Sequence, residues 1–238
     1  STLEKNDAGF RKQSGTVLKN PTTGEIKLIP PQNPKDIEEL MTNLVDYIND
    51  SSLEDFDSLV KMAIIHYQFE SIHPFYDGNG RTGRIINILY LVLENLLDVP
   101  ILYLSRYIIK NKADYYRLLN DVSFNDGLNN WILFILKGIE EISKETIKTI
   151  KNIENLMNET KNIIVEQKPK IYSKDLLEAL FYHPYTKRAF IEEQLNVSRP
   201  TATSYLNDLE KLGILSSKKI GKEVFYVHNK LFELFKDM

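Results

Sequence analysis

The sequence predicts a mainly α-helical protein with one small β-hairpin near its start and a winged-helix arrangement, a helix-turn-helix plus a β-wing, at its end. Three observations support this. Apolar residues recur at spacings of three and four over much of residues 33–165. Turn-forming residues separate two short β-type runs between residues 15 and 30. After Pro169 the pattern changes to three short helices and two β-type runs around Gly221.

The elements follow from these patterns in chain order. A hairpin is expected at about 15–30, where residues 16–18 and 26–29 flank the turn formers of residues 20–24, and Pro30-Pro31 ends it. Helices are expected at about 33–48, at 56–70, after Arg81, at 105–121 and at 129–165. The C-terminal part is expected to form helices at 176–182, 187–195 and 198–212, with wing strands near 214–215 and 224–227.

The charge distribution supports a division into two domains, at 1–166 and 167–238. Residues 168–238 carry 12 Lys and Arg against 9 Asp and Glu, whereas residues 1–167 carry 18 against 24. The basic excess of the second part is too small to establish nucleic-acid binding.

Composition excludes several classes of protein. The chain has no cysteine, which excludes disulfides, thiolate zinc sites and cysteine nucleophiles. No apolar run approaches the roughly 20 residues of a membrane span, and residues 1–10 lack the apolar core of a signal peptide. We therefore expect a cytoplasmic protein without a membrane partner. Because the chain starts at Ser1, we also expect that an N-terminal segment has been removed.

One segment, residues 73–84, concentrates the chemistry. Gly78 and Gly80 let backbone amides approach an anion where a helix begins, a position that favours phosphate. Arg81 and Arg84 share one helical face and can grip phosphoryl oxygens. Asp77 is an oxygen ligand of the kind that Mg²⁺ prefers. His73 can accept a hydroxyl proton near neutral pH.

Each of these residues also has a structural explanation when it is taken alone. A glycine-rich turn is often only a tight connection, a lone histidine is usually structural, and arginines commonly pair with carboxylates. A plain turn, however, needs no histidine, acid, asparagine and two arginines together. Three further residues, His66, Trp131 and Phe134, are most simply core residues, with a supporting role near the site as the alternative for His66.

The segment resembles a known family signature. His73 to Arg84 matches in full the His-Pro-Phe-x-Asp/Glu-Gly-Asn-Gly-Arg-x-x-Arg motif of the Fic family, whose typical members are AMP transferases. The lead-in at 66–72, the hairpin followed by Pro30-Pro31 and the Tyr115-Tyr116 pair extend the resemblance over roughly residues 9–140.

The resemblance implies a role for each matching residue. His73 is the expected general base and Asp77 the expected ligand of a Mg²⁺ cofactor that accompanies ATP. The expected nucleotide-binding residues are Gly78, Asn79, Gly80, Arg81, Thr82, Gly83 and Arg84, with Tyr115 and Tyr116 near the adenine. The hairpin at 15–30 is then the family's flap, along which a target protein docks by strand addition; alternatively, it is only structural.

The expected function is transfer of AMP from ATP to a Ser, Thr or Tyr hydroxyl of a target protein, with release of pyrophosphate and with self-modification. Two alternatives stay open: a winged-helix transcriptional regulator that only senses nucleotide, and the same fold transferring another phosphate-containing group. The family's inhibitory Ser/Thr-x-x-x-Glu-Gly/Asn motif is absent from residues 1–238. We therefore expect control by a missing N-terminal segment, with control by a partner, or no control, as the alternatives.

The C-terminal unit leaves two partners open. Ser198 followed by Pro200 predicts a capped helix that presents Arg199, Thr201, Thr203 and Ser204 outward and buries Ala202, Leu206, Leu209 and Leu212. With Lys218, Lys219 and Lys222 on the wing, this pattern suits either DNA or a docking protein. Homo-oligomerisation is a further use of such a module.

Overall fold

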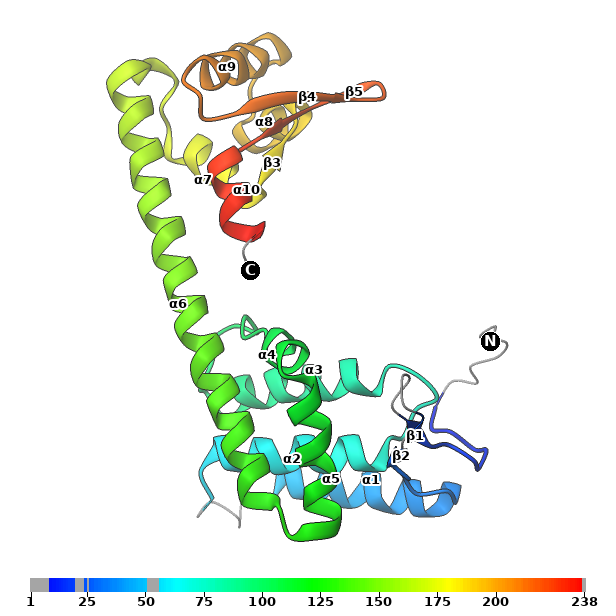
Figure 1. Cartoon of the computed structure of the whole chain (residues 1–238). Helices are drawn as coiled ribbons and strands as arrows, with labels where there is room; N and C mark the ends of the chain where they lie inside the picture. Colours follow the sequence, from blue (N-terminus) through cyan, green and yellow to red (C-terminus); the bar gives the residue numbers. More distant parts are fainter. Residues whose placement is uncertain (1–8, 20–23, 25, 51–55, 237–238) are drawn as a thin grey trace. The chain divides into compact units, whose positions relative to one another are not determined.

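The chain divides into two compact units, Ser1–Thr146 and Ile147–Met238. The computed structural model describes residues 9–19, 24, 26–50 and 56–236. Figure 1 shows helices through most of this length, with short strands near both ends. The mainly helical fold class is thus confirmed. The predicted ranges 1–166 and 167–238 divide the chain at the end of its longest helix, whereas the units divide it inside that helix.

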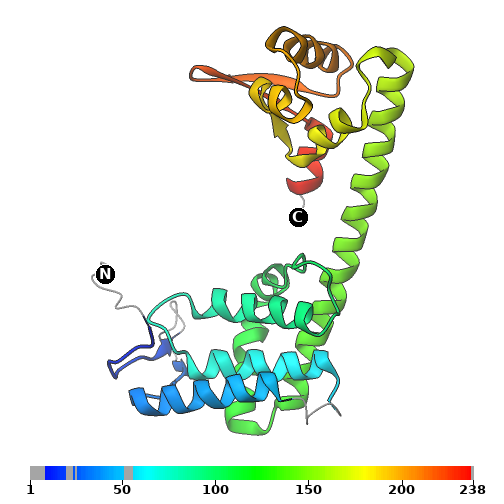
Figure 2. The ribbon, with the colours of Figure 1, turned by 180° about the vertical axis from the view of Figure 1, so that it is seen from behind.

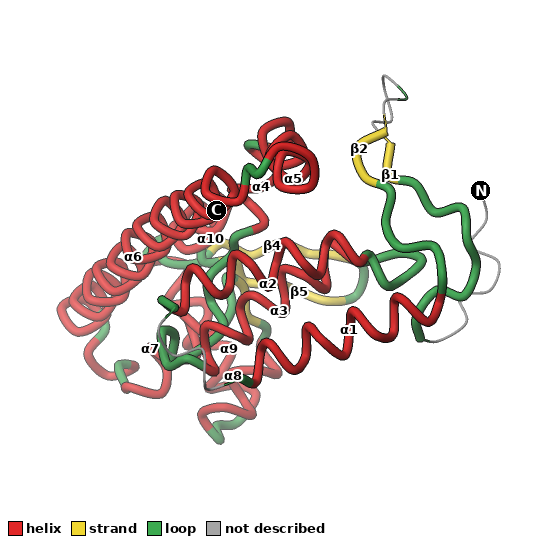
Figure 3. Tube along the Cα trace, turned by 90° about the horizontal axis from the view of Figure 1, so that it is seen from below, coloured by secondary structure: helices red, strands yellow, loops and turns green. Residues whose placement is uncertain are grey.

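Unit 1 begins with a hairpin and three helices. The hairpin pairs β1 (Leu18–Lys19) with β2 (Ile26–Leu28) antiparallel, as expected, while residues 20–23 of its turn lie outside the described residues. The helices are α1 (Pro34–Asn49), α2 (Ser58–Ile72) and α3 (Asn79–Leu93). They lie side by side, with the hairpin at one end (Figure 3).

A single helix was predicted at 105–121, but two helices form there, α4 (Ser105–Lys110) and α5 (Lys112–Asn125). The break falls at Asn111, which leaves helical geometry with φ −113° and ψ 34°. Its side-chain Nδ2 donates to the carbonyl of Tyr107 at 2.9 Å. Asparagine offers the backbone this alternative to continued helix, so it ends α4 without disturbing the apolar spacing.

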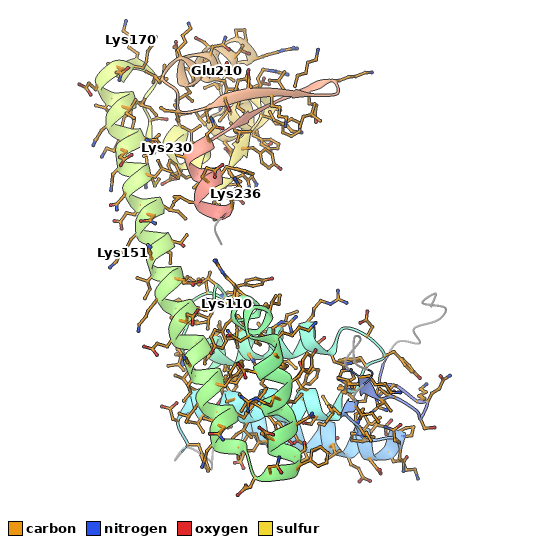
Figure 4. All side chains as sticks on the ribbon, viewed as in Figure 1. Lys110, Lys151, Lys170, Glu210, Lys230 and Lys236 are labelled. Carbon is orange, nitrogen blue, oxygen red and sulfur yellow. The ribbon has the colours of Figure 1, made fainter. Side chains whose placement is uncertain are left out.

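The core of unit 1 forms where α6 (Leu128–Gln167) packs on α2. Trp131 is fully buried, and its indole Nε1 donates to the carbonyl of Ala63 at 2.8 Å. Phe134 is partly buried against the same core. The predictions for both aromatic residues are confirmed. On the surface, Lys110 of α4, labelled in Figure 4, pairs with Glu141 of α6 at 2.8 Å.

Unit 2 contains the three predicted helices and a two-stranded ribbon. The first wing strand was expected near 214–215 but begins at Ser216 instead, and a 3₁₀ helix (Pro169–Ile171), a two-residue strand and a last helix were not predicted. The helices and strands of the unit are α7 (Lys174–Tyr182), β3 (Tyr185–Thr186), α8 (Arg188–Leu195), α9 (Arg199–Lys211), β4 (Ser216–Ile220), β5 (Glu223–Val227) and α10 (Asn229–Lys236). The strand order is β3-β5-β4, antiparallel throughout. The β4–β5 ribbon projects past the helices of its unit (Figure 2).

Helix α9 begins as its sequence predicts. The Ser198 hydroxyl accepts the Thr201 amide, and proline occupies the first turn. Ala202, Leu206 and Leu209 are fully buried, and Leu212 is partly buried. This inward face, with Ile164 and Ile191, makes the core of unit 2.

No helix in the described part of the chain is both long and apolar enough to cross a membrane.

Candidate active site

The loop between α2 and α3 turns sharply at both of its ends. His73 caps α2 in the left-handed region, with φ 50° and ψ 57°, and its amide donates to the carbonyl of Phe69 at 3.0 Å. Gly78 precedes α3 with φ 85°, a conformation that glycine adopts without strain. Two reversals within six residues bring the histidine close to the start of the next helix in the chain.

Asn79 fixes the shape of this loop from inside. Its Oδ1 accepts the amide of Phe75 at 2.8 Å, and its Nδ2 donates to the carbonyl of the same residue, also at 2.8 Å. The residue is 2% exposed. Because both ends of the amide are bound to backbone, the side chain braces the loop.

The N-terminus of α3 leaves amides available to an anion. The first hydrogen bond at this end of the helix joins the Thr82 amide to the Gly78 carbonyl at 2.9 Å. The amides of Asn79, Gly80 and Arg81 precede it and lie at the positive end of the helix dipole. This is the arrangement that binds phosphate at helix starts.

Asp77 and Arg81 lie at the exposed edge of the loop. Asp77 Oδ1 accepts the Gly78 amide at 2.7 Å, and its Oδ2 lies 3.4 Å from Arg81 Nη2. The side chains are 61% and 74% exposed, so the pair contributes roughly 0–1 kcal/mol and is easily exchanged for a ligand.

A Mg²⁺ ion would find one carboxylate here, that of Asp77. Among the described residues, no group of three or more His, Cys, Asp or Glu side chains comes together as a metal site. Magnesium commonly takes only one or two protein carboxylates and completes its shell with phosphates and water. Asp77 therefore fits a nucleotide-bound Mg²⁺ and not a site made wholly of protein.

Arg84 reaches back along α3 toward its first turn. A Cβ atom on Gly80 would lie 3.1 Å from Arg84 Nη1, so the absence of a side chain there makes room for the guanidinium. The Nε of Arg84 is buried and has no hydrogen-bond partner among the residues that the structure describes. The arginine therefore keeps unused donor capacity beside the amides of the helix start.

The imidazole of His73 is half-buried, and burial lowers its pKa from the ordinary 6.5. The carbonyl of Glu70 opposes this shift, and the positive charge of Arg11 adds to it. Nδ1 of the ring is buried and has no hydrogen-bond partner of normal geometry among the described residues. A neutral imidazole can accept a proton.

The comparisons with known proteins agree with this geometry. Residues 6–91 match the Fic/DOC family. This part of the chain is a Fic/DOC domain. Residues 156–231 match a second family, described as the C-terminal domain of SoFic-like protein adenylyltransferases.

Curated relatives match the Fic part of the chain. Protein adenylyltransferase fic-1 of Caenorhabditis elegans is 31% identical over 110 residues, which are 46% of this chain and 20% of that protein. Probable protein adenylyltransferase aq_aa38 of Aquifex aeolicus is 38% identical over 100 residues, which are 42% of this chain and 28% of that protein. The matched region thus spans less than a third of the length of either relative.

A crystal structure of a Fic family protein from Desulfovibrio desulfuricans G20 has the same fold. The TM-score is 0.53 at 21% identity, over 94% of this chain and 64% of that chain. The similarity extends well beyond the Fic/DOC match, and at this identity it concerns the fold alone.

Two tyrosines, Tyr115 and Tyr116, were expected beside the adenine, and the structure buries the first of them. Tyr115 is 4% exposed, and its hydroxyl lies 3.0 Å from Nε2 of His66, inside the core. In this position little of its ring is open to a ligand. Tyr116, edge-on to it at 5.3 Å, is partly exposed and remains the candidate. His66 itself is fully buried, as predicted for a core histidine.

Gly83, expected to contact the nucleotide, also has a packing role that was not predicted. A Cβ atom there would lie 2.7 Å from Glu70 Oε1 and 3.1 Å from Phe69 Cδ1. Gly83 therefore lies on the face of α3 that packs against α2, where it permits close approach of the two helices. The amide of Thr82, bound to the Gly78 carbonyl, is likewise committed to the helix.

Two residues of the site had no sequence-based prediction. Glu70 is 5% exposed on α2, and no described residue forms a hydrogen bond with its Oε1, although the side chain lies near Arg84. An acidic residue on a mostly apolar helix was the available signal for it. Arg11 donates its Nε to the His73 carbonyl at 2.8 Å from 62 residues away in sequence. Only the folded structure reveals that contact.

Proposed function

We propose that this chain transfers AMP from ATP to a hydroxyl of a protein, using the loop of residues 73–84. One observation carries the proposal: a histidine whose pKa is lowered by burial directly precedes a helix start with unused amides and an arginine with unused donors. A base and a polyphosphate grip in one short loop suit a nucleotidyl transfer. The names of the curated relatives point the same way.

In the proposed reaction the target hydroxyl attacks the α-phosphorus of ATP. A new oxygen–phosphorus bond forms, the bond to pyrophosphate breaks, and His73 takes the hydroxyl proton. The amides at the start of α3 would receive the α-phosphate, while Arg84 and Arg81 would hold the outer phosphates. Bound through Asp77, Mg²⁺ would neutralise phosphate charge.

The β1–β2 hairpin is the proposed docking site for the target. Within the part of the chain that the structure describes, its two short strands pair only with each other, so an extended segment can add to an outer edge. Arg11 links the segment that follows the hairpin to the loop of residues 73–84, because its guanidinium donates to the carbonyls of both Pro31 and His73. A segment added there would present its hydroxyl from the flap side of the site.

The pKa of His73 favours this function over nucleotide sensing. A regulator that only binds nucleotide needs the phosphate grip but has no use for a neutral base beside it. Transfer of another phosphate-containing group would use the same residues, and identification of the transferred group separates that alternative.

The His73→Ala variant tests the proposal. We expect transfer of AMP, including self-modification, to fall by about 10²–10⁴-fold, because the variant lacks the base. ATP affinity should stay near wild type, because no phosphate contact is lost. Mass spectrometry of the modified protein measures the first quantity, and calorimetric titration with ATP measures the second.

Exposed His183 provides the matched control. His183→Ala should keep both transfer and binding. Transfer at the wild-type rate by His73→Ala would refute the proposed mechanism, and absence of any AMP adduct from the wild type would refute the proposed function.

A further inference from the structure

Arg11 is a fully buried arginine that binds backbone carbonyls through two of its guanidinium nitrogens, while the third, Nη1, has no partner among the described residues. Its Nε donates to the His73 carbonyl at 2.8 Å, and its Nη2 donates to the carbonyls of Ile72, at 3.3 Å, and Pro31. Its own amide donates to the Pro74 carbonyl at 2.8 Å. Within the described residues, no carboxylate pairs with it. One side chain therefore holds the end of α2 and the segment that follows β2.

Burial of an unpaired cation costs several kcal/mol unless polar groups surround it. Here the compensation comes from carbonyls at the C-terminal end of α2, where the helix dipole favours positive charge. A plain helix cap would need only an exposed lysine or arginine. Complete burial of the guanidinium against His73 indicates a more specific requirement.

The requirement concerns the conformation of His73. This residue has φ 50°, in the left-handed region that costs a non-glycine residue roughly 1–3 kcal/mol unless its surroundings impose it. Arg11 binds the carbonyl of that same residue. The bond fixes the peptide that follows His73 and with it the direction in which the imidazole leaves the backbone.

The neighbours of Arg11 hold the other side of the loop. We call residues 10–13 the strap. The amides of Lys12 and Gln13 both donate to the hydroxyl of Tyr76, at 2.8 and 3.3 Å, and the ring of Phe10 lies 5.8 Å from that of Phe75. The strap thus clamps residues 72–76 from several directions, with Arg11 as its buried member.

Arg11 also acts on His73 electrostatically. Burial is the main cause that lowers the pKa of His73, and the charge of Arg11 adds to it, while the Glu70 carbonyl of α2 opposes both. Arg11 in turn interacts with Tyr76. The same contact that orients the imidazole therefore also favours its neutral form.

We propose that Arg11 is a positioning residue for His73: by binding the carbonyls of Ile72, His73 and Pro31, it sets the base relative to the flap without touching the nucleotide. The inference rests on the proposed function, in which His73 is the base. It predicts a loss of transfer rate with no loss of nucleotide affinity, because the amides of α3, Arg81 and Arg84 are left in place.

The tests are the variants Arg11→Met and Arg11→Lys, with Lys35→Met as the matched control. Lys35 is exposed on α1 and lies four residues beyond Pro31, so its replacement changes the charge equally without disturbing the loop. Arg11→Met should lower kcat for AMP transfer by about 10–100-fold, since small misplacements of a catalytic group cost up to about 10²-fold. The Kd for ATP should stay within about twofold in all three variants.

The pH dependence separates positioning from mere structural support. In Arg11→Met the pKa of the His73 ring should rise, so the acidic limb of the kcat profile should move to higher pH. Arg11→Lys keeps the charge but loses the planar set of donors, so kcat should fall while the limb stays in place. Lys35→Met should change neither. The inference would be overturned if kcat were unchanged in Arg11→Lys and if the acidic limb of the kcat–pH profile did not move in Arg11→Met.

NMR titration of the His73 ring in the free protein gives an independent readout. A raised pKa in Arg11→Met, but not in Arg11→Lys or Lys35→Met, supports the contact even if the wild type transfers no AMP, in which case only the proposed function fails. If Arg11→Met does not fold, Arg11→Lys decides: reduced kcat with intact ATP affinity supports the inference, and wild-type kcat overturns it.

Discussion

Glu70 and His66 lie in the interior of unit 1 beside Gly83. Burial shifts the pKa of each side chain in the direction that favours its neutral form. The pKa of Glu70 is raised from 4.5 to about 7, with Arg84 opposing the effect of burial. The pKa of His66 is lowered from 6.5 to about 3, mainly by burial and further by Arg84. Each residue is therefore charged less readily in the folded protein than in the unfolded chain.

The two residues have opposite effects on the pH dependence of stability. For Glu70 the folded protein binds the proton more tightly, so the free energy of unfolding falls as pH rises from about 4.5 to about 7. For His66 the unfolded chain binds the proton more tightly, so the free energy of unfolding rises as pH increases from about 3 to about 6.5. The two slopes oppose each other over the shared range.

Glu70→Gln isolates the contribution of the carboxyl. At pH 8 we expect the variant to be more stable than wild type by up to about 3 kcal/mol, the free energy that a shift of this size represents. At pH 5 the difference should shrink below about 1 kcal/mol, because Glu70 is then protonated in the folded state and little is gained by replacing it. Urea unfolding at both pH values measures this difference, to which His66 contributes equally in both proteins.

The control is Glu39→Gln, at an exposed position on α1, which should show no such pH dependence. If Glu70→Gln were less stable than wild type by the same margin at pH 5 and pH 8, Glu70 would be charged in the folded protein and the raised pKa would be wrong.

At the scale of single residues, the sequence predicted the candidate site residues that follow one another in the chain. It missed those that only the fold brings to the site. Residues 73–84 were recognisable because base, glycines and arginines follow one another in the chain. Arg11 and Glu70 were not, because a buried arginine bound to carbonyls and a carboxyl between two helices leave no periodic signal. For the same reason, the contact between the Tyr115 hydroxyl and His66 in the core was not predicted.

At the scale of elements, helix existence was predicted well because apolar spacing persists over many residues. The predicted elements were wrong or missing where the sequence pattern that indicates them covers only a few residues. Asn111 ends α4 by a local hydrogen bond that leaves the spacing intact. Strand β3 has two residues, and its partner β5 lies about forty residues farther along the chain, so only tertiary pairing defines it.

Gly138 of α6 is required by close packing on α4. A Cβ atom there would lie 2.5 Å from Cδ1 and 2.9 Å from Cε1 of Tyr107, a buried ring, and 3.1 Å from Leu104. Gly138→Ala gains about 1 kcal/mol of helix propensity. The overlap should cost more, within the roughly 1–3 kcal/mol typical of overpacking. We expect a net loss of about 1–2 kcal/mol in urea unfolding.

Lys137→Ala, at the adjacent exposed position of the same helix, should change stability by less than about 0.5 kcal/mol. A Gly138→Ala variant as stable as wild type would mean that α4 and α6 approach less closely than the structure has them.

At the scale of the whole molecule, two separate cores explain the division into units. The core of unit 1 uses buried residues between Leu28 and Ile142, and the core of unit 2 uses buried residues between Ile164 and Leu215. The sequence indicated two units through the change of pattern after Pro169 and the change of charge. It could not place the division inside α6, because one uninterrupted helical period runs through the division point.

Because the buried core of unit 2 lies wholly within residues 147–238, this fragment should fold alone. We expect a cooperative urea transition and the helical circular dichroism of α7 to α10 and the second part of α6. Leu206→Ala, which removes a fully buried side chain from α9, should destabilise the fragment by about 2–5 kcal/mol. Ile220→Ala, at a position 56% exposed, should have a far smaller effect. A fragment that stays unfolded in dilute buffer, or one in which the two substitutions are equivalent, would show that the second core does not support an independent unit.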